Sequence, residues 1–301
     1  MITIENVSKN FKKVRALDGV SLEVAEGAVH GLVGSNGSGK STLMRIMMDI
    51  YRPDGGRVLC DGVDVRKSAA IRNDTFYIAE EQYAFPYARI KDMAKFFAAY
   101  YKRFDMPLFK KYCEDFEFDL NSVVTSLSKG MRKQVTVLTA MAAHPKYLLC
   151  DETFDGLDPV VRNAVKAIVF ERVEEEGMGV FISSHDLSQI DGMCDSLTLL
   201  HKGKVELLGD PVGLKSEFFA ATVSFTEDNI PTPERLKELG VVTSKLEYGA
   251  GRIVIRGSEA DVRARLAALS PEYFRILPMT LEEIFISEME IRGYERNVFS
   301  S

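Results

Sequence analysis

The sequence lacks any apolar stretch long enough to cross a membrane. A membrane-spanning helix needs about 20 mostly apolar residues, whereas the longest segments without Asp, Glu, Lys or Arg are residues 27–39 and 134–145. Residues 1–14 also lack an apolar stretch suited to a signal peptide. We therefore expect a cytoplasmic protein.

An excess of basic residues is missing as well. The chain has 38 Lys and Arg against 44 Asp and Glu, a formal net charge of -6, and the basic residues are scattered. Proteins that bind a phosphate backbone depend on excess Lys and Arg. We therefore expect no nucleic-acid partner.

Paired cysteines are also missing. The four cysteines are far apart and form no C-x-x-C pair; they are Cys60, Cys113, Cys150 and Cys194. Each lies among apolar residues, which favours buried free thiols in a reducing compartment, with a disulfide or zinc site as the alternative.

The length of 301 residues corresponds to about two domains. Up to residue 209, predicted strands alternate with predicted helices, which indicates an α/β sheet. The strands are expected at residues 2–7, 20–24, 29–33, 57–59, 147–150 and 180–183, and the helices at 43–50, 90–112, 131–143 and 159–176. The character of the sequence changes after residues 209–211, and a small α+β appendage is expected at about residues 217–301, with strands at 222–225, 241–246 and 252–255 and helices at 233–239 and 259–269.

A glycine-rich motif lies between the predicted buried strand at residues 29–33 and the next helix. It reads Gly34-x-x-x-x-Gly39-Lys40-Ser41, and strand–loop–helix is the context that a phosphate-binding P-loop requires. Glycines let the backbone wrap around phosphate oxygens, and the helix N-terminus attracts the anion. We expect Lys40 to reach the β- and γ-phosphates and Ser41 to give an oxygen to Mg²⁺.

Two carboxylates, Asp151 and Glu152, end the apolar run at residues 147–150. In a P-loop fold the metal-organising strand ends in this way, so Asp151 is expected to hold Mg²⁺ and Glu152 to act as general base on the attacking water. Without the P-loop, such a run would indicate only a strand that meets solvent.

Two further motifs are weaker. His185 follows the apolar run at 180–183 and is expected to contact the γ-phosphate, although a lone histidine at a strand end is more often structural. Leu127-Ser128-Lys129-Gly130-Met131 leads into a helix, where Ser128 and the local amides form a second anion site or an ordinary helix cap.

The order and spacing of these motifs resemble the ATPase subunit of ATP-binding cassette (ABC) transporters over residues 2–215. Phe11 matches the aromatic residue that stacks on adenine, and the loop at residues 34–42 matches the Walker A motif. Ser128 and Gly130 match the family signature, and Asp151 with Glu152 matches Walker B and the catalytic glutamate. Residues 156–158 match the D-loop, which ends in Asp158, and His185 matches the switch histidine. The ATP-binding set of the resemblance is Phe11, Gly34, Ser35, Asn36, Gly37, Ser38, Gly39, Lys40, Ser41 and Thr42.

The resemblance implies a P-loop NTPase of the α/β class, with an antiparallel β subdomain and a helical subdomain at about residues 84–143. The expected domains are an ABC ATPase domain at 1–215 and an accessory domain at 216–301. ATP and Mg²⁺ are the implied cofactors.

The chain departs from the family pattern at two places. Lys129 and Met131 replace the usual Gly and Gln of the signature, while its serine and second glycine are retained. In the loop after residue 78, Glu80 takes the position of the family's metal-sensing Gln, and Gln82 offers the matching chemistry two residues later. A solvated loop is the alternative for both.

In this family two subunits sandwich two ATP molecules head to tail. The resemblance thus implies a second ATPase subunit, identical or related, whose Ser128 and Gly130 face the Walker A loop of the first. ATP would close the dimer and hydrolysis would open it.

The resemblance also implies a separate transmembrane permease subunit, which would place the protein peripherally on the inner face of the cell membrane. Phe85, Pro86 and Tyr87 are the candidates for permease contact, with core packing as the alternative, and residues 96–101 are expected in the core. The motif at residues 279–285 resembles the tail of bacterial export-type ATPases for drugs, antibiotics or ions, so we expect an exporter.

Two other functions are alternatives. One is a soluble ABC ATPase without a permease, acting on the ribosome or on DNA; the single P-loop, the lack of heptads and the acidic balance disfavour it. The other is a regulatory module with little hydrolysis, which Glu152 and His185 disfavour.

Overall fold

The computed structural model describes residues 1–68, 72–81 and 87–291. The chain divides into two compact units, Met1–Leu208 and Gly209–Ser301. The expected boundary near residue 215 falls inside helix α8 (Pro211–Glu217). This helix packs on elements of the second unit, so the second unit begins before that residue.

The first unit contains a six-stranded sheet in the order β10-β9-β3-β8-β7-β6. From β9 to β6 the neighbouring strands pair in parallel. The bounds of the six strands are β3 Val29–Val33, β6 Thr75–Ile78, β7 Tyr147–Asp151, β8 Gly179–Ser184, β9 Ser196–His201 and β10 Lys204–Gly209. Every residue of β3, β7 and β8 is buried, which confirms the prediction that these apolar runs are strands covered on both faces.

A second sheet of the first unit is antiparallel, in the order β2-β1-β4-β5. Its strands are β1 Ile2–Phe11, β2 Val14–Val24, β4 Gly55–Cys60 and β5 Val63–Asp64. Apolar residues of this sheet, of helix α1 (Lys40–Met47) and of β3, β7 and β8 form one hydrophobic cluster. The β subdomain expected from the resemblance is therefore present and packs on the main sheet through a shared core.

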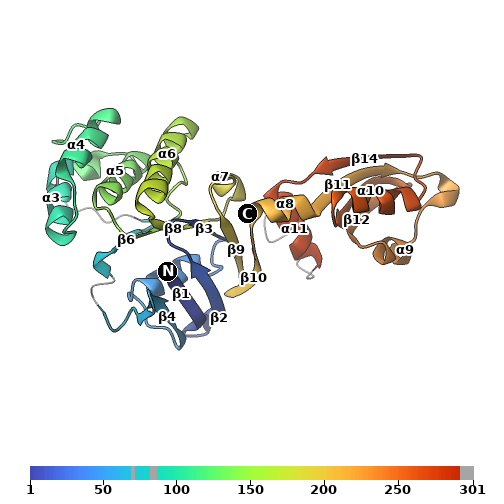
Figure 1. Ribbon diagram of the computed structural model, residues 1–301, viewed down its shortest axis with the longest axis horizontal. Helices are drawn as coiled ribbons and strands as arrows, with labels where there is room; N and C mark the ends of the chain where they lie inside the picture. The colour runs from blue at the N-terminus through green and yellow to red at the C-terminus, as the bar shows by residue number, and fades with distance from the viewer. Residues whose placement is uncertain (69–71, 82–86, 292–301) are drawn as a thin grey trace. The chain divides into compact units, whose positions relative to one another are not determined.

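Helices of the first unit lie across the main sheet from the antiparallel strands (Figure 1). They are α3 Ile90–Tyr100, α4 Met106–Asp115, α5 Lys129–Ala142 and α6 Pro159–Glu176, with a short α7 Leu187–Ile190 and a 3₁₀ turn at Val124–Ser126. The sequence predicts α5 and α6 closely. Helices α3 to α5 fall within the expected helical subdomain.

The single helix expected at residues 90–112 was wrong. The chain leaves the helix at Tyr101, and Asp105 starts α4 by accepting a hydrogen bond from the Leu108 amide at 2.9 Å. Pro107 sits in the first turn of α4, where a missing amide hydrogen costs nothing. Residues 96–101 were expected in the core. Tyr101 is buried as expected, but Phe96 and Tyr100 are about half exposed.

The second unit is an α+β fold around a four-stranded antiparallel sheet in the order β12-β13-β11-β14. In chain order β11 Phe218–Ser224, α9 Pro233–Glu238, β12 Val241–Glu247, β13 Ala250–Arg256, α10 Glu259–Ala268 and β14 Tyr273–Pro278 form the βαββαβ pattern of ferredoxin-like folds. A 3₁₀ turn at Glu227–Asn229 precedes α9, and α8 and α11 (Leu281–Ile291) flank the motif.

The two faces of this sheet bury different side chains, as the two-residue period of a strand requires. Ala221 and Ile253 pack with α9 and α10 on one face. Ala220 and Val254 pack with α8 and α11 on the other. The strand β14 and the two flanking helices had not been predicted, but the α+β class was.

Within the described residues, no helix combines the length and apolarity needed to span a membrane. All four cysteines are free thiols; Cys60, Cys113 and Cys150 are buried, and Cys194 is half-buried.

Candidate active site

The P-loop follows β3 and ends at α1, and its glycines are fixed by close packing. A Cβ on Gly34 would lie 2.2 Å from the Leu200 carbonyl oxygen, and one on Gly39 would lie 2.5 Å from that of Ala16. Gly39 also has a φ of 113°, which favours glycine. The loop therefore keeps its backbone accessible at positions that no larger residue can occupy.

Several groups of the loop fit an anion. No side chain among the described residues caps the N-terminus of α1, so its first amides are free to bind oxygen atoms. The Ser38 hydroxyl is buried and has no hydrogen-bond partner in the described part of the chain. Such an orphaned polar atom is rare in a folded protein and suits a bound phosphate.

Lys40 is buried, with its Nζ atom in the concavity of the loop. It donates to the carbonyl oxygens of Gly34 at 2.6 Å and Ser35 at 3.3 Å, and it lies 3.0 Å from Glu152 Oε1. Only 5% of its side chain is exposed, so water screens its charge less than it would screen that of a surface lysine.

Asp151 is fully buried at the end of β7, and hydroxyls hold both of its carboxylate oxygens. Ser183 donates to Oδ1 at 2.7 Å and Tyr77 donates to Oδ2 at 3.0 Å. Two fixed donors orient this carboxylate, while each oxygen keeps a lone pair for a water or a metal ion.

Glu152, Asp155 and His185 form a compact polar cluster at the same sheet edge. His185 Nδ1 lies 2.7 Å from Glu152 Oε2 and 3.0 Å from Asp155 Oδ2. One candidate ligand atom from each residue lies within 4.8 Å of the others. The ammonium of Lys40 on the same carboxylate opposes a further cation, so we interpret the cluster as a hydrogen-bonded unit.

The surroundings shift the pKa values of the two carboxyl groups of this cluster in opposite directions. Burial acts to raise the pKa of Glu152, but hydrogen bonds from Asp155 and His185 and the charge of Lys40 lower it below the ordinary value. Burial and the neighbouring Glu152 carboxylate raise the pKa of Asp155. Burial acts to lower the pKa of His185, but the carboxyl groups of Glu152 and Asp155 act more strongly, so the pKa is raised above the ordinary value. The carboxyl of Glu152 therefore loses its proton at a lower pH than the carboxyl of Asp155.

The main candidates meet because parallel strands end at one edge of the sheet. The P-loop follows β3, Glu152 follows β7, and His185 follows β8, which lies between them in the sheet. Glu80 lies two residues beyond Ile78 of β6, whose partner in the register is Cys150. It is exposed near the same edge; Gln82, Phe85 and Pro86 lie outside the described residues.

The remaining candidates have exposed positions. Phe11 is 40% exposed at the end of β1, with its ring edge against Tyr51 at a centroid distance of 5.3 Å. Ser128 caps α5 by accepting from the Met131 amide at 3.2 Å, and Asp158 caps α6 by accepting from Val160 and Val161. Ser128 thus forms the ordinary helix cap that was one of its two interpretations, and it also lies at an exposed helix start where an anion could bind.

Four residues of the site had escaped the sequence analysis: Tyr77, Lys133, Asp155 and Ser183. All four lie within a few residues of predicted motifs. Lys133 could have been noticed as a charged residue on the apolar face of α5, with Leu138 and Val137 buried near it.

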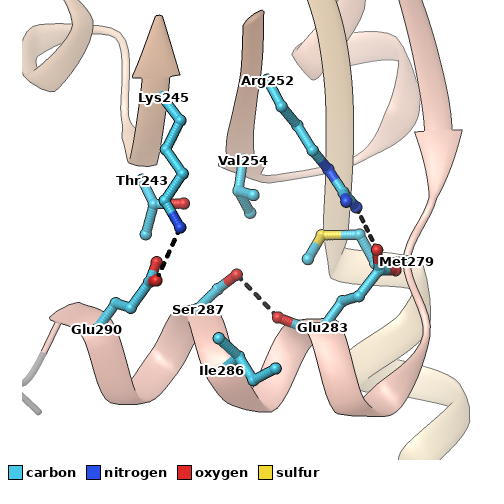
Figure 2. A pocket seen from close by; sticks show the side chains of 9 residues that line it. All are labelled: Thr243, Lys245, Arg252, Val254, Met279, Glu283, Ile286, Ser287 and Glu290. Atoms are coloured by element: carbon cyan, nitrogen blue, oxygen red, sulfur yellow. Dashed lines mark hydrogen bonds and ion pairs between the residues drawn. The ribbon is translucent and has the colours of Figure 1, made fainter. Parts of the chain in front are cut away.

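A separate small cavity lies within the second unit, with a volume of about 110 Å³. It is lined by β12, β13 and α11, and Figure 2 shows an ion pair on each side: Lys245 with Glu290 at 3.0 Å and Arg252 with Glu283 at 2.5 Å. Each charge that lines the cavity is thus already paired.

Comparison with known proteins identifies the family. The ABC transporter family model matches residues 17–155. The ABC transporter ATP-binding protein YtrB of Bacillus subtilis is 28% identical over 96% of this chain and 98% of its own length. A probable sulfate/thiosulfate import ATP-binding protein, CysA of Chlorella vulgaris, is 31% identical over 69% of this chain and 90% of its own length.

This chain belongs to the ABC transporter ATP-binding proteins. A solved ATP-binding subunit of an ABC transporter superposes with a TM-score of 0.64 at 25% identity, over 71% of this chain and 92% of that one. The fold and the ATPase activity expected from the motifs are therefore confirmed. The export-type assignment is not, since CysA carries the name of an import protein.

Proposed function

We propose that this ABC ATPase powers a separate membrane permease, that it works at the cytoplasmic face of the membrane, and that transport runs outward. The convergence of the P-loop, Glu152 and His185 at one sheet edge supports the ATPase half of this proposal. The motif at residues 279–285 supports export, as a resemblance only. Its Ile284 and Met279 are buried in the second unit.

ATP is proposed to lie on residues 34–42, with its adenine against the exposed ring of Phe11. Ser41, in the first turn of α1, and Asp151 offer the hydroxyl and carboxylate oxygens that Mg²⁺ prefers, and Glu80 or Gln82 would complete the set. The two hydroxyl donors on Asp151 fit this role because they fix the carboxylate. Bound Mg²⁺ would neutralise charge on the phosphates.

Hydrolysis is proposed to depend on three side chains. Glu152 accepts the proton of the attacking water, since its carboxyl is ionised at neutral pH and lies beside Lys40 and His185. Lys40 stabilises the charge on the phosphates, and His185 holds the γ-phosphate while its Nδ1 contacts Glu152.

The proposed site needs a second ATPase subunit. Ser128 is exposed on the first turn of α5, where it could contact ATP held by another copy or by a related chain. Asp158 would lie in the same dimer contact, at the exposed start of α6.

Glu152→Gln tests the assigned roles. The substitution keeps the size of the side chain and removes the base, so ATP turnover should fall by about 10²- to 10⁴-fold while ATP binding persists. Light scattering should then show an ATP-dependent dimer, because the ligand that closes it is no longer consumed.

Glu171→Gln is the matched control, because Glu171 is exposed on α6 away from the cluster. Its turnover should equal that of the unchanged protein. A Glu152→Gln protein with normal turnover would contradict the general-base assignment.

The permease partner can be tested at Tyr87, whose side chain is 88% exposed. A photo-crosslinking amino acid at this position should capture a polypeptide with several membrane spans when the protein is bound to its native membranes. The same group at position 171 should not. Cross-links from position 87 only to ribosomal proteins or nucleic acid would contradict the proposal and favour a permease-independent ABC ATPase.

A further inference from the structure

The backbone of Glu152 adopts a conformation that needs support. Its φ is 48°, in the left-handed region that residues other than glycine rarely adopt. Such strain persists only where the surroundings fix it. Two buried side chains hold the two sides of this residue: Ser183 Oγ accepts from its amide at 3.1 Å, and Lys133 Nζ donates to its carbonyl oxygen at 2.5 Å.

Lys133 is the less expected of the two partners. Its side chain is 1% exposed, and Nζ also donates to the Asp155 carbonyl oxygen at 2.7 Å. Burying an ammonium group is costly unless hydrogen bonds compensate it. Here the two hydrogen bonds go to the first and the last residue of the segment 152–155, so the lysine ties the two ends of that segment together.

The electrostatics of Lys133 agree with this position. Burial lowers its pKa and the charge of Lys129 acts in the same direction, while the carboxylates of Asp155, Glu152 and Glu80 act to raise it. The same acidic groups that surround the reacting end of the site therefore stabilise the ammonium.

Lys133 also connects two parts of the site along one helix. It lies five residues beyond Ser128, the N-cap of α5, which corresponds to about 7.5 Å along a helix axis. In the same helix a Cβ on Gly130 would lie 3.4 Å from the Gly156 carbonyl oxygen. The first two turns of α5 thus run directly along the loop that follows Glu152.

We propose that Lys133 is a positioning residue for ATP hydrolysis. It holds the Glu152 peptide in its left-handed conformation and so aims the carboxylate toward Lys40 and His185. Because it stands on the helix that starts at Ser128, a movement of the signature turn changes the aim of Glu152. This inference rests on the proposed role of Glu152 as general base.

The test is Lys133→Met, which keeps the length and apolar stem and removes the donors. A misplacement of about 1 Å can cost roughly a hundredfold in rate, so kcat should fall by about tenfold to a hundredfold. The KM for ATP should change by less than about twofold, because the hydrogen bonds of Lys133 go to the carbonyl oxygens of Glu152 and Asp155, which lie outside residues 34–42. Lys133→Gln keeps a donor and should fall between the two proteins.

Lys166→Met is the matched control, since Lys166 is a half-buried lysine of α6 whose pKa burial also lowers. It should leave kcat unchanged. Circular dichroism and urea unfolding of each variant would show that the assays measure folded protein. If Lys133→Met does not fold, Lys133→Gln carries the same comparison of kcat with KM.

The combination with Glu152→Gln separates this proposal from the one on which it rests. Lys133→Met should not lower the residual turnover of Glu152→Gln, because it acts through that carboxylate. Normal turnover in Glu152→Gln alone would overturn the general-base role. A deficient Glu152→Gln together with kcat within twofold of normal in Lys133→Met, or a loss confined to KM, would overturn only the role of Lys133.

Discussion

At the residue scale, the contact between Lys40 and Glu152 brings the two central side chains of the site into one ion pair. Lys40 has three donors, and Gly34, Ser35 and Glu152 provide acceptors for all of them. A phosphate that approaches the loop must therefore take over at least one of these bonds. The exchange with the Glu152 carboxylate would release the carboxylate to act on water, so the proposed binding and chemistry share one group.

A different buried residue, His30 on β3, links the fold to pH. Only 2% of it is exposed, and its Nε2 and Nδ1 atoms lie 2.8 Å from Thr198 Oγ1 and 2.7 Å from Ser196 Oγ. Burial lowers the pKa of His30 to about 4. Because a histidine of the unfolded chain has a pKa of about 6.5, the unfolded state binds more protons between these two values.

The contribution of neutral His30 to the free energy of unfolding should therefore be complete above about pH 6.5 and decrease as the pH drops toward 4. Over this range the protein should lose roughly 3 kcal/mol of stability because of His30. In His30→Gln, urea unfolding across this window should show a shallower pH dependence, by up to one proton. His144→Gln, which removes a half-buried histidine that lies beside Glu176, is the comparison variant and should keep the pH dependence that comes from His30. Parallel curves for His30→Gln and the unchanged protein would refute this account.

The sequence could predict those site residues whose type and spacing follow from phosphate chemistry. Gly34, Lys40, Asp151 and Glu152 fall into this class, and the structure brings them to one sheet edge. Lys133 could not be predicted in this way. Its role depends on a carbonyl oxygen 19 residues away in the chain, and carbonyl oxygens leave no mark in a sequence.

At the element scale, the regular period of buried side chains was the reliable signal. Strands such as β3 and helices such as α6 were predicted because their apolar residues are continuous or their caps are clear. The break between α3 and α4 was missed because aromatic residues continue through it. Only the Asp105 cap and Pro107 mark the new helix, and both are compatible with a loop.

The second unit contains a strand that the local sequence pattern did not reveal. No residue of strand β14 is fully buried, and apolar residues stand next to one another in its sequence, Tyr-Phe-Arg-Ile-Leu-Pro, so the residue types show little alternation. It is a strand because β11 provides a regular antiparallel partner from Phe219 to Ser224. Pairing between distant segments, not local sequence, therefore decided this element.

At the scale of the whole molecule, each of the three hydrophobic clusters described above lies within one of the two compact units. The hydrophobic cluster of the first unit contains residues of its two sheets and of α1. Both clusters of the second unit contain only residues beyond 209. Every candidate for nucleotide contact belongs to the first unit. A ligand bound there should thus stabilise one unit directly and leave the other to its own stability.

The absence of tryptophan makes this testable, because a single introduced tryptophan reports on one unit. Phe97→Trp would report on the first unit and Phe274→Trp on the second; both positions are half-buried. In a Glu152→Gln background, ATP with Mg²⁺ at a hundred times its Kd should stabilise the first unit by about 2.7 kcal/mol. That corresponds to a shift on the order of 1 M in the urea midpoint, whereas the second reporter should keep its midpoint. Equal shifts of both reporters would mean that the two units unfold together, and a shift of the second alone would place the nucleotide outside the proposed site.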